Sequence, residues 1–148
     1  MTIADVLAQK GTQVFTINHD ELVSEALRIF TEKHIGALVA LDAEQNIRGI
    51  ITERDILHMY AAGDSGRGTL VKDIMTPAKK LIIGQKNNDL EYVMSIMTEN
   101  RMRHMPIIDD KGKLAGFISI GDIVKALLKN AEYEKKVLSD YIQGTYPK

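Results

Sequence analysis

The sequence lacks cysteine altogether. Without cysteine the chain has no disulfide framework, no thiolate zinc site and no cysteine nucleophile. It also lacks an apolar run of the roughly 18 residues that a membrane helix needs. Its N-terminus has neither the basic segment nor the apolar segment of a secretory signal peptide. We therefore expect a soluble, cytoplasmic protein that does not act at a membrane.

An excess of either charge sign is also missing. Nineteen lysines and arginines balance twenty aspartates and glutamates, which leaves a net charge of −1. Proteins that bind nucleic acid normally carry a clear basic excess. We therefore do not expect nucleic acid as the main partner, although a small anion-binding pocket is compatible with this balance.

The usual catalytic and metal-binding patterns are missing as well. The four histidines do not have the spacing of metal ligands, and no HExxH sequence occurs. Residues 63–69 have the glycine spacing of a P-loop, but Thr69 stands where that motif needs its lysine. No segment combines a nucleophile, a base and an oxyanion donor. We expect no catalytic residue and no metal site, and thus a binding module rather than an enzyme.

The chain does contain an internal repeat. A shift of 67 residues places residues 14–57 on residues 81–124 without a gap, and the apolar positions agree better than the identities. Matched pairs include Glu32 with Glu99, Gly49 with Gly116 and Asp55 with Asp122. A shorter match between residues 2–7 and 69–75 gives each copy its own lead-in. The chain has the length of about one domain and is built from two copies of one unit.

Each copy has the hydrophobic pattern of a β–α–β–β–α unit. Short apolar runs predict buried strands, whereas apolar residues three and four apart predict helices. In the first copy we expect strands at residues 14–17, 37–41 and 47–52, a helix from Val23 that ends at Gly36, and a helix at residues 55–62. In the second copy we expect strands at residues 81–83, 105–108 and 114–119, a helix at residues 90–100, and a helix that begins at Asp122. The predicted class is mixed α/β (α+β), with a C-terminal helix.

A glycine-rich segment at residues 63–68 separates the copies and is the natural linker. We therefore divide the chain into residues 1–66, 67–128 and 129–148: a first repeat with its lead-in helix, a second repeat with its lead-in, and a helical tail. Apolar residues continue at helical spacing into this tail. Such a stripe is either a solvated extension folded on its own domain or a homodimer contact. We favour the dimer contact, because an isolated apolar stripe would otherwise stay in water.

One motif occurs in both copies, at residues 49–56 and 116–123. It consists of glycine, two apolar residues, serine or threonine, two variable residues, aspartate and an apolar residue. With the supporting segments 35–39 and 102–106 and the lead-in 73–77, the chain resembles a tandem pair of cystathionine-β-synthase (CBS) domains. The resemblance covers nearly the whole chain, from about residue 2 to about residue 128. It implies two pseudo-symmetric repeats packed as one module, often paired with a second module in a flat dimer.

The resemblance also implies an adenosine-containing ligand: AMP, ADP, ATP, NAD or S-adenosylmethionine. The Ser/Thr-x-x-Asp element lies where a strand leads into a helix. Unpaired backbone N–H groups at that helix start attract a phosphate, and the aspartate can accept hydrogen bonds from both ribose hydroxyls. The alternative is purely structural, with Asp55 and Asp122 acting as helix caps.

By resemblance, each site draws on both repeats. The first site is expected to comprise Thr52, Arg54, Asp55, Met102, Arg103 and His104. The second is expected to comprise Ser119, Asp122, Ile35, Gly36 and Ala37. Thr12 and Lys80 are expected at the edges of the adenine pockets.

The two predicted sites differ in charge. Gly121, Gly36 and Ala37 stand where the other copy has Arg54, Arg103 and His104. The first site, or the phosphate region between the sites, is therefore expected to prefer more phosphate. It should also weaken as His104 loses its proton, near pH 6.5 for an unperturbed imidazole.

Two functions follow from this pattern. One is a regulatory sensor, in which the nucleotide shifts the pose of the repeats and an unidentified downstream protein reads the change. The other is a protein-interaction or dimerisation scaffold whose clefts stay empty. Both aspartates keep their hydroxyl partners, and this favours the sensor.

Overall fold

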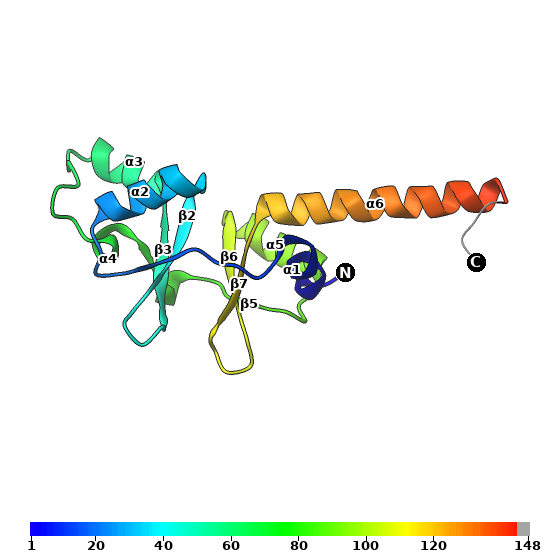
Figure 1. Ribbon diagram of the computed structural model, residues 1–148, viewed down its shortest axis with the longest axis horizontal. Coiled ribbons are helices and arrows are strands. Elements are labelled where there is room, and N and C mark those ends of the chain that lie inside the picture. The colour runs from blue at the N-terminus through cyan, green and yellow to red at the C-terminus, as the bar shows by residue number, and fades with distance from the viewer. Residues whose placement is uncertain (145–148) are drawn as a thin grey trace.

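The computed structural model describes residues 1–144, which form two β-sheets with helices packed against them (Figure 1). The elements of the first half are α1 (Ile3–Lys10), β1 (Thr16–Asn18), α2 (Val23–Lys33), β2 (Ala37–Leu41), β3 (Ile47–Thr52) and α3 (Glu53–Ala61). The second half contains α4 (Val71–Ile74), β4 (Thr76–Pro77), η1 (Ala78–Lys80), β5 (Gly84–Gln85), α5 (Leu90–Glu99), β6 (His104–Ile108), β7 (Leu114–Ser119) and α6 (Ile120–Ile142).

The two sheets have the same topology in their repeated parts. In the first, β1 runs parallel to β2, and β2 is antiparallel to β3. In the second, β5 runs parallel to β6, and β6 is antiparallel to β7. The registers also correspond, since Ala37 pairs with Thr52 and His104 pairs with Ser119. These observations confirm the predicted mixed α/β fold of two β–α–β–β–α repeats.

Several element boundaries differ from the sequence prediction. Helix α6 begins at Ile120 rather than at Asp122, because the Ser119 side chain caps it. Residues 81–83, predicted as a strand, lie before strand β5. Helix α2 ends at Lys33 because His34 adopts the left-handed conformation (φ 54°) and its N–H bonds to the Phe30 carbonyl. Gly36 therefore lies beyond the helix end. Helix α3 begins at Glu53 rather than at Asp55, because the Thr52 side chain already caps it.

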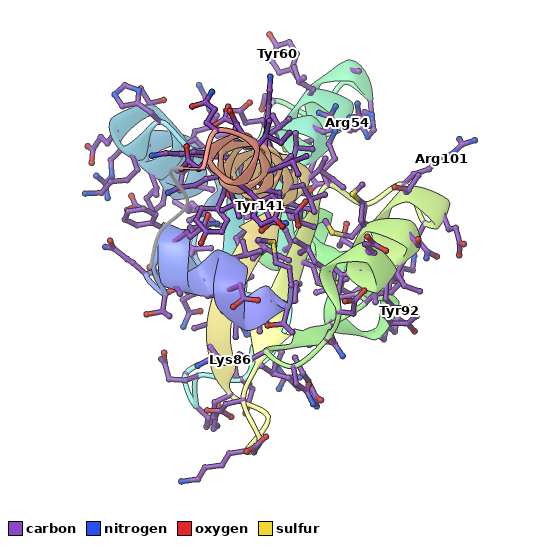
Figure 2. All side chains as sticks on the ribbon, turned by 90° about the vertical axis from the view of Figure 1, so that its right-hand side faces the viewer. Arg54, Tyr60, Lys86, Tyr92, Arg101 and Tyr141 are labelled. Carbon is purple, nitrogen blue, oxygen red and sulfur yellow. The ribbon has the colours of Figure 1, made fainter. Side chains whose placement is uncertain are left out.

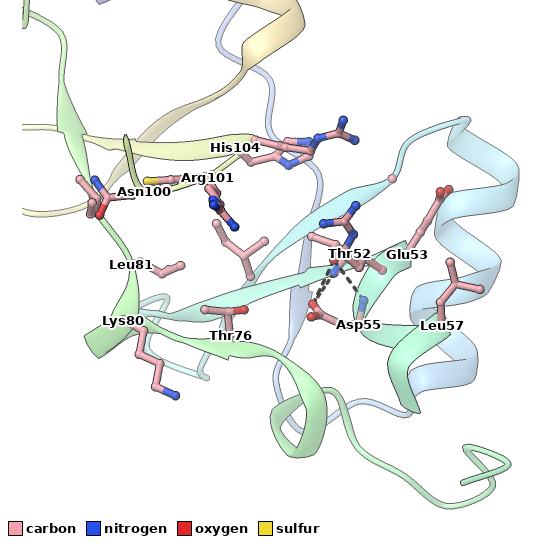
Figure 3. Close-up of a pocket in the computed structure, with 16 residues that line it drawn as sticks. Thr52, Glu53, Asp55, Leu57, Thr76, Lys80, Leu81, Asn100, Arg101 and His104 are labelled. Atoms are coloured by element: carbon pink, nitrogen blue, oxygen red, sulfur yellow. Dashed lines mark hydrogen bonds between the residues drawn. The ribbon is translucent and has the colours of Figure 1, made fainter. Parts of the chain in front are cut away.

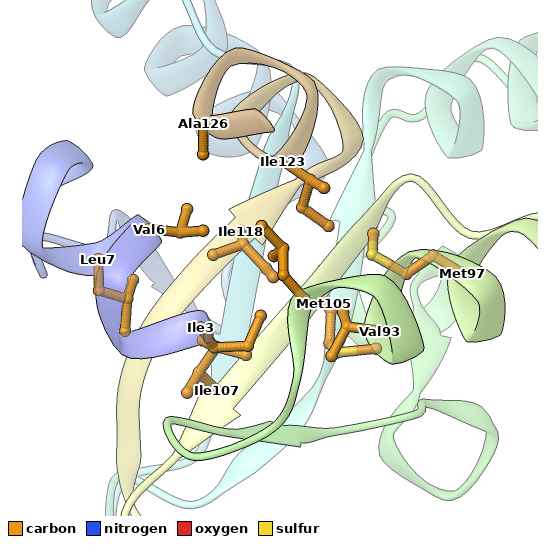
Figure 4. Close-up of a cluster of buried hydrophobic side chains, with 11 residues drawn as sticks. Ile3, Val6, Leu7, Val93, Met97, Met105, Ile107, Ile118, Ile123 and Ala126 are labelled. Carbon is orange, nitrogen blue, oxygen red and sulfur yellow. The ribbon is translucent and has the colours of Figure 1, made fainter. Parts of the chain in front are cut away.

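Each repeat has its own apolar core, and the lead-in segments are exchanged between them. The core of the second repeat includes Ile3, Val6 and Leu7 from α1 (Figure 4). The core of the first repeat includes Val71, with Ile74 and Met75 packed against it. The predicted division at residue 66 separates the two copies of the repeat along the sequence. In the structure, each lead-in packs mainly on the repeat that it does not precede.

The shared glycine of the motif permits this exchange. A Cβ atom at Gly49 would lie 2.4 Å from the Thr76 carbonyl oxygen, and one at Gly116 would lie 2.8 Å from a methyl carbon of Leu7. At Gly49 the clash would be with backbone, so only glycine permits that approach, whereas at Gly116 the Leu7 side chain would have to shift. At the first repeat the approach lets β4 pair with β3, with Thr76 opposite Ile50.

Helix α6 extends well past the second repeat (Figure 1). Its buried residues are Ile123 and Ala126, both close to its start. Beyond Ala126 the helix exposes Leu128, Leu138 and Ile142. None of the helices within residues 1–144 is long and apolar enough to cross a bilayer.

Candidate ligand-binding site

A cavity of about 650 Å³ lies between the two repeats, at the start of α3 (Figure 3). The first repeat contributes Gly36, Ile50, Thr52, Glu53, Arg54, Asp55 and Leu57. The segment from β4 to β5 contributes Thr76, Lys80, Leu81 and Ile82, and the turn after α5 with the start of β6 contributes Asn100, Arg101, Met102, Arg103 and His104. The volume is in the range of small-molecule sites.

The Thr52–Asp55 element at the rim of this cavity is a capping box. The Thr52 backbone N–H donates to Oδ2 of Asp55 at 2.8 Å, and the Asp55 N–H donates to the Thr52 hydroxyl oxygen at 3.3 Å (Figure 3). Thr52 is thus the N-cap and Asp55 the third helical residue, which corrects the alternative that Asp55 caps the helix. The hydrogen bonds that the Asp55 carboxylate accepts from the Thr52 N–H and hydroxyl both end on Oδ2.

The capping box alone does not make a ligand site. Thr2 and Asp5 form nearly the same arrangement at the start of α1, with a distance of 2.8 Å from the Thr2 nitrogen to Oδ2 of Asp5. Both residues lie outside the cavity. The position of Thr52 and Asp55 on the cavity wall, rather than the motif, singles them out as candidates.

The cavity wall carries a basic excess. Its charged residues apart from histidine are the basic Arg54, Lys80, Arg101 and Arg103 and the acidic Glu53 and Asp55. Arg101 has a left-handed backbone (φ 53°), which is uncommon for a residue other than glycine. The turn around it closes when the Met102 N–H bonds to the Met97 carbonyl at 2.9 Å. This turn brings two arginines to the same wall.

His104 connects the cavity with the start of α6. Its ring stacks on Phe117, with centroids 5.3 Å apart, and it pairs with Ser119 across the β6–β7 ladder. Burial, reinforced by the Lys10 and Arg103 charges, lowers the pKa of His104 below 6.5, although Asp122 opposes the shift. The expected change near pH 6.5 assumed an unperturbed imidazole, so the lowered pKa of His104 moves that expected change to lower pH.

At the second predicted site Ser119 and Asp122 form the same capping box, but Asp122 also makes an ion pair with Lys10. The Ser119 N–H donates to Oδ2 of Asp122 at 2.8 Å. Nζ of Lys10, at the end of α1, lies 2.6 Å from the same oxygen. Burial alone would raise the pKa of Asp122, but the hydrogen bonds from Lys10 and Ser119 outweigh it and the pKa is lowered. The three basic side chains predicted for the first site, Arg54, Arg103 and His104, line the first cavity. Lys10, which the sequence prediction did not include, pairs with Asp122 at the second helix start.

The contacts recorded for Ile35, Gly36 and Ala37 lie in the first repeat, and their place in the second site stays a prediction. Ile35 packs against the first core, and Ala37 is buried opposite Thr52 in the β2–β3 ladder. Gly36 lines the first cavity, because its carbonyl accepts the Glu53 N–H at 3.0 Å and holds this segment at the start of α3. Thr12 is exposed and does not line the first cavity, so its adenine contact stays a prediction.

The cavity wall contains all six residues that the sequence grouped in the first site, Thr52, Arg54, Asp55, Met102, Arg103 and His104, and it also contains Lys80. Their contacts with a ligand stay a prediction. Sequence reasoning missed Arg101, Asn100 and Thr76. Arg101 could have been found from its place two residues before Arg103. Thr76 could not, because its position depends on the pairing of β4 with β3.

Comparisons with known proteins agree with this architecture. The model of the CBS domain family matches residues 3–62 and again residues 71–129. The mitochondrial CBS domain-containing protein CBSX3 of Arabidopsis thaliana is 40% identical, over 98% of this chain and 73% of its own length. A solved CBS-domain protein from Burkholderia ambifaria is 37% identical with a TM-score of 0.80, over 87% of this chain and 95% of that one.

A third protein, CBSX2, was solved in complex with AMP. It is 24% identical with a TM-score of 0.73, over 88% of this chain and 98% of that one, and this likeness concerns the fold alone. Two family matches in register, the relative at 40% identity and the paired sheets lead to the same conclusion. The chain belongs to the CBS domain family and contains a tandem pair of these domains.

Proposed function

We propose that the chain is a regulatory module that binds an adenosine-containing nucleotide in the Thr52–Asp55 cavity. The observation that carries the proposal is the composition of the cavity wall, which joins residues of both repeats. A ligand that touches both repeats binds best to one relative pose of them and so shifts their equilibrium toward it. We propose binding and signalling rather than catalysis as the activity.

Each part of such a nucleotide has a matching part of the wall. Ile50, Leu81, Ile82 and Met102 offer an apolar surface for adenine. The Asp55 carboxylate, whose two bonds with Thr52 both use Oδ2, can accept hydrogen bonds from ribose hydroxyls. Arg54 at the start of α3, with Arg101 and Arg103 opposite, suits a phosphate, since arginine binds phosphate bidentately. The AMP complex of CBSX2, which shares the fold, supports this ligand class.

We also propose that two chains form a homodimer through their helices. Leu57 and Tyr60 of α3 are 68% and 72% exposed, and Tyr60 projects from the surface (Figure 2). In the second repeat, Val124 occupies the position of Leu57 and is also exposed. Large apolar side chains gathered on helices of both repeats are typical of a protein interface. A downstream protein would read the pose of this assembly.

The experiment starts with the protein as purified under native conditions. Small molecules are extracted and identified by mass spectrometry, and the emptied protein is titrated calorimetrically with AMP and with GMP. We expect an adenosine-containing molecule in the extract and tighter binding of AMP than of GMP. A protein that binds neither nucleotide, yet remains folded and oligomeric, would support the scaffold function instead.

A further inference from the structure

The last turns of α6 lie outside the apolar cores of the chain. Helix α6 runs from Ile120 to Ile142 and extends past the second repeat (Figure 1). After Leu127, no residue of α6 belongs to either core of the described residues 1–144, and none of residues 128–142 is buried. Isolated helices of about 12–15 residues are only marginally stable in water. A surface that covers one face of this tail would therefore stabilise it.

One face of the helix has the spacing of a coiled coil. Six positions recur at intervals of four, three, four, three and four residues, which is the a/d spacing that places them on a single stripe. We call these six residues the seam: Val124, Leu128, Ala131, Lys135, Leu138 and Ile142. Every residue of the seam is exposed, and only Lys135 among them is not apolar.

The seam is complementary to itself when two α6 helices run antiparallel. Its intervals are the same in both directions, so two helices centred on residue 133 place every seam residue opposite another seam residue. The opposed pairs are Val124 with Ile142, Leu128 with Leu138, and Ala131 with Lys135. Each pair occurs twice, as a two-fold symmetric contact requires. The surface that fits the seam is thus the seam of a second copy.

Lys135 favours this direction over a parallel one. In a parallel pair in register, the two Lys135 ammonium groups would share one layer and repel each other. In the antiparallel pair Lys135 lies opposite the small Ala131, which leaves room for its apolar stem. Glu132 and Glu134 flank the seam on its two sides, so a carboxylate of the second copy is within reach of the ammonium. A single lysine at such a position is a known means of setting how coiled-coil helices pair.

The seam also continues the face proposed for the homodimer. Val124, its first residue, corresponds to the exposed Leu57 of α3 in the first repeat. We propose that the seam pairs with the seam of a second copy as an antiparallel two-stranded coiled coil. The inference rests on the homodimer of the proposed function and names its contact and direction, but it does not depend on a nucleotide.

The absence of cysteine from the chain makes a cross-linking test direct. In the proposed pair Leu128 faces Leu138 of the second copy, whereas the two copies of Leu128 lie ten residues apart, about 15 Å along the helix. A disulfide forms only when the Cα atoms are within about 7 Å. Full-length Leu128→Cys and Leu138→Cys proteins are oxidised separately and after mixing under reducing conditions, and the products are identified by mass spectrometry. Tyr133→Cys is the matched control, because it lies level with its own copy but on the outer face of the helix.

We expect the mixture to form a disulfide between the two different variants. Either variant alone, and Tyr133→Cys, should form little cross-linked product. Efficient cross-linking of Leu128→Cys or Leu138→Cys with itself would show a parallel pair and overturn the inference.

Sedimentation of charged variants gives a second measurement. Leu138→Asp should raise the dimer dissociation constant at least about tenfold, because it places a carboxylate in the seam. Tyr133→Asp adds the same charge on the outer face, where Tyr133 is 67% exposed, and should leave the dimer unchanged. Equal effects of the two variants would contradict the seam as the contact.

The remaining outcomes separate this inference from the proposed function. If the wild type sediments as a dimer but the cysteine mixture forms no mixed disulfide, the dimer contact lies on other helix faces. The inference is then wrong and the proposed homodimer stands. If the wild type is a monomer at micromolar concentration, the inference and the homodimer are both overturned, while the nucleotide titration decides the binding function by itself.

Discussion

Replacement of Asp55 by alanine should separate the two roles of its carboxylate. The structural role is the capping box, in which Oδ2 accepts the Thr52 N–H at 2.8 Å. Loss of a helix cap costs about 0.5–2 kcal/mol of folding free energy. The proposed ligand role is a ribose hydrogen bond to a charged acceptor, worth about 1.5–3 kcal/mol. Because about 1.4 kcal/mol is a factor of ten, the dissociation constant for AMP should rise roughly 10- to 150-fold at this site.

The chain supplies a matched control for this variant. Asp5 accepts the Thr2 N–H at 2.8 Å in a capping box that lies outside the cavity. Asp5→Ala should therefore lose a similar amount of stability in urea unfolding but retain AMP binding in calorimetry. The reasoning is refuted if Asp55→Ala binds AMP at the first site as the wild type does. It is also refuted if Asp5→Ala, while folded, loses binding to the same extent.

Three further predictions concern packing, pH and assembly. Gly49→Ala should lower the free energy of unfolding by about 1–3 kcal/mol, because its Cβ would meet the Thr76 carbonyl oxygen at 2.4 Å. Gly121→Ala, whose Cβ has only a contact at 3.6 Å, should be tolerated; equal losses would contradict the packing account. Burial and the Lys10 charge lower the pKa of His104, so the unfolded chain binds more protons and stability should fall as the pH drops below about 6.5. His104→Phe should reduce that fall, and an identical pH profile would contradict it. Truncation after Lys129 removes the exposed Leu138 and Ile142. In sedimentation experiments the truncated chain should form a weaker dimer, while both repeats stay folded. A wild type that sediments as a monomer at micromolar concentration would contradict the proposed dimer.

The internal repeat made most of the fold predictable. A gapless shift forces each element of one copy to have a counterpart in the other, and the strand registers obey this, as the Ala37–Thr52 and His104–Ser119 pairs do. The helix end at His34 was not predictable in the same way. A left-handed histidine is a rarer helix terminator than glycine, and Gly36 stood two residues further along.

The sequence could predict those residues of the candidate site whose position depends only on their near neighbours in the chain. The Thr52–Asp55 spacing forms a capping box by itself, so these residues had to lie at a helix start. The Lys10–Asp122 ion pair joins residues 112 positions apart and depends on the exchange of lead-ins between the repeats. The sequence pattern within one copy does not predict this exchange. Each lead-in directly precedes one copy in the sequence but packs mainly on the other copy in the structure.

The central claim is that an adenosine nucleotide binds between the repeats at the Thr52–Asp55 cavity. The most direct measurement is a backbone amide NMR titration of the full chain with AMP. The account predicts shift changes in two segments far apart in sequence, residues 52–55 and 100–104, which line the same cavity. It predicts little change at Thr2 and Asp5, where the same capping motif lies outside that cavity. Saturable changes confined to other surfaces, or none at millimolar AMP, would contradict the account.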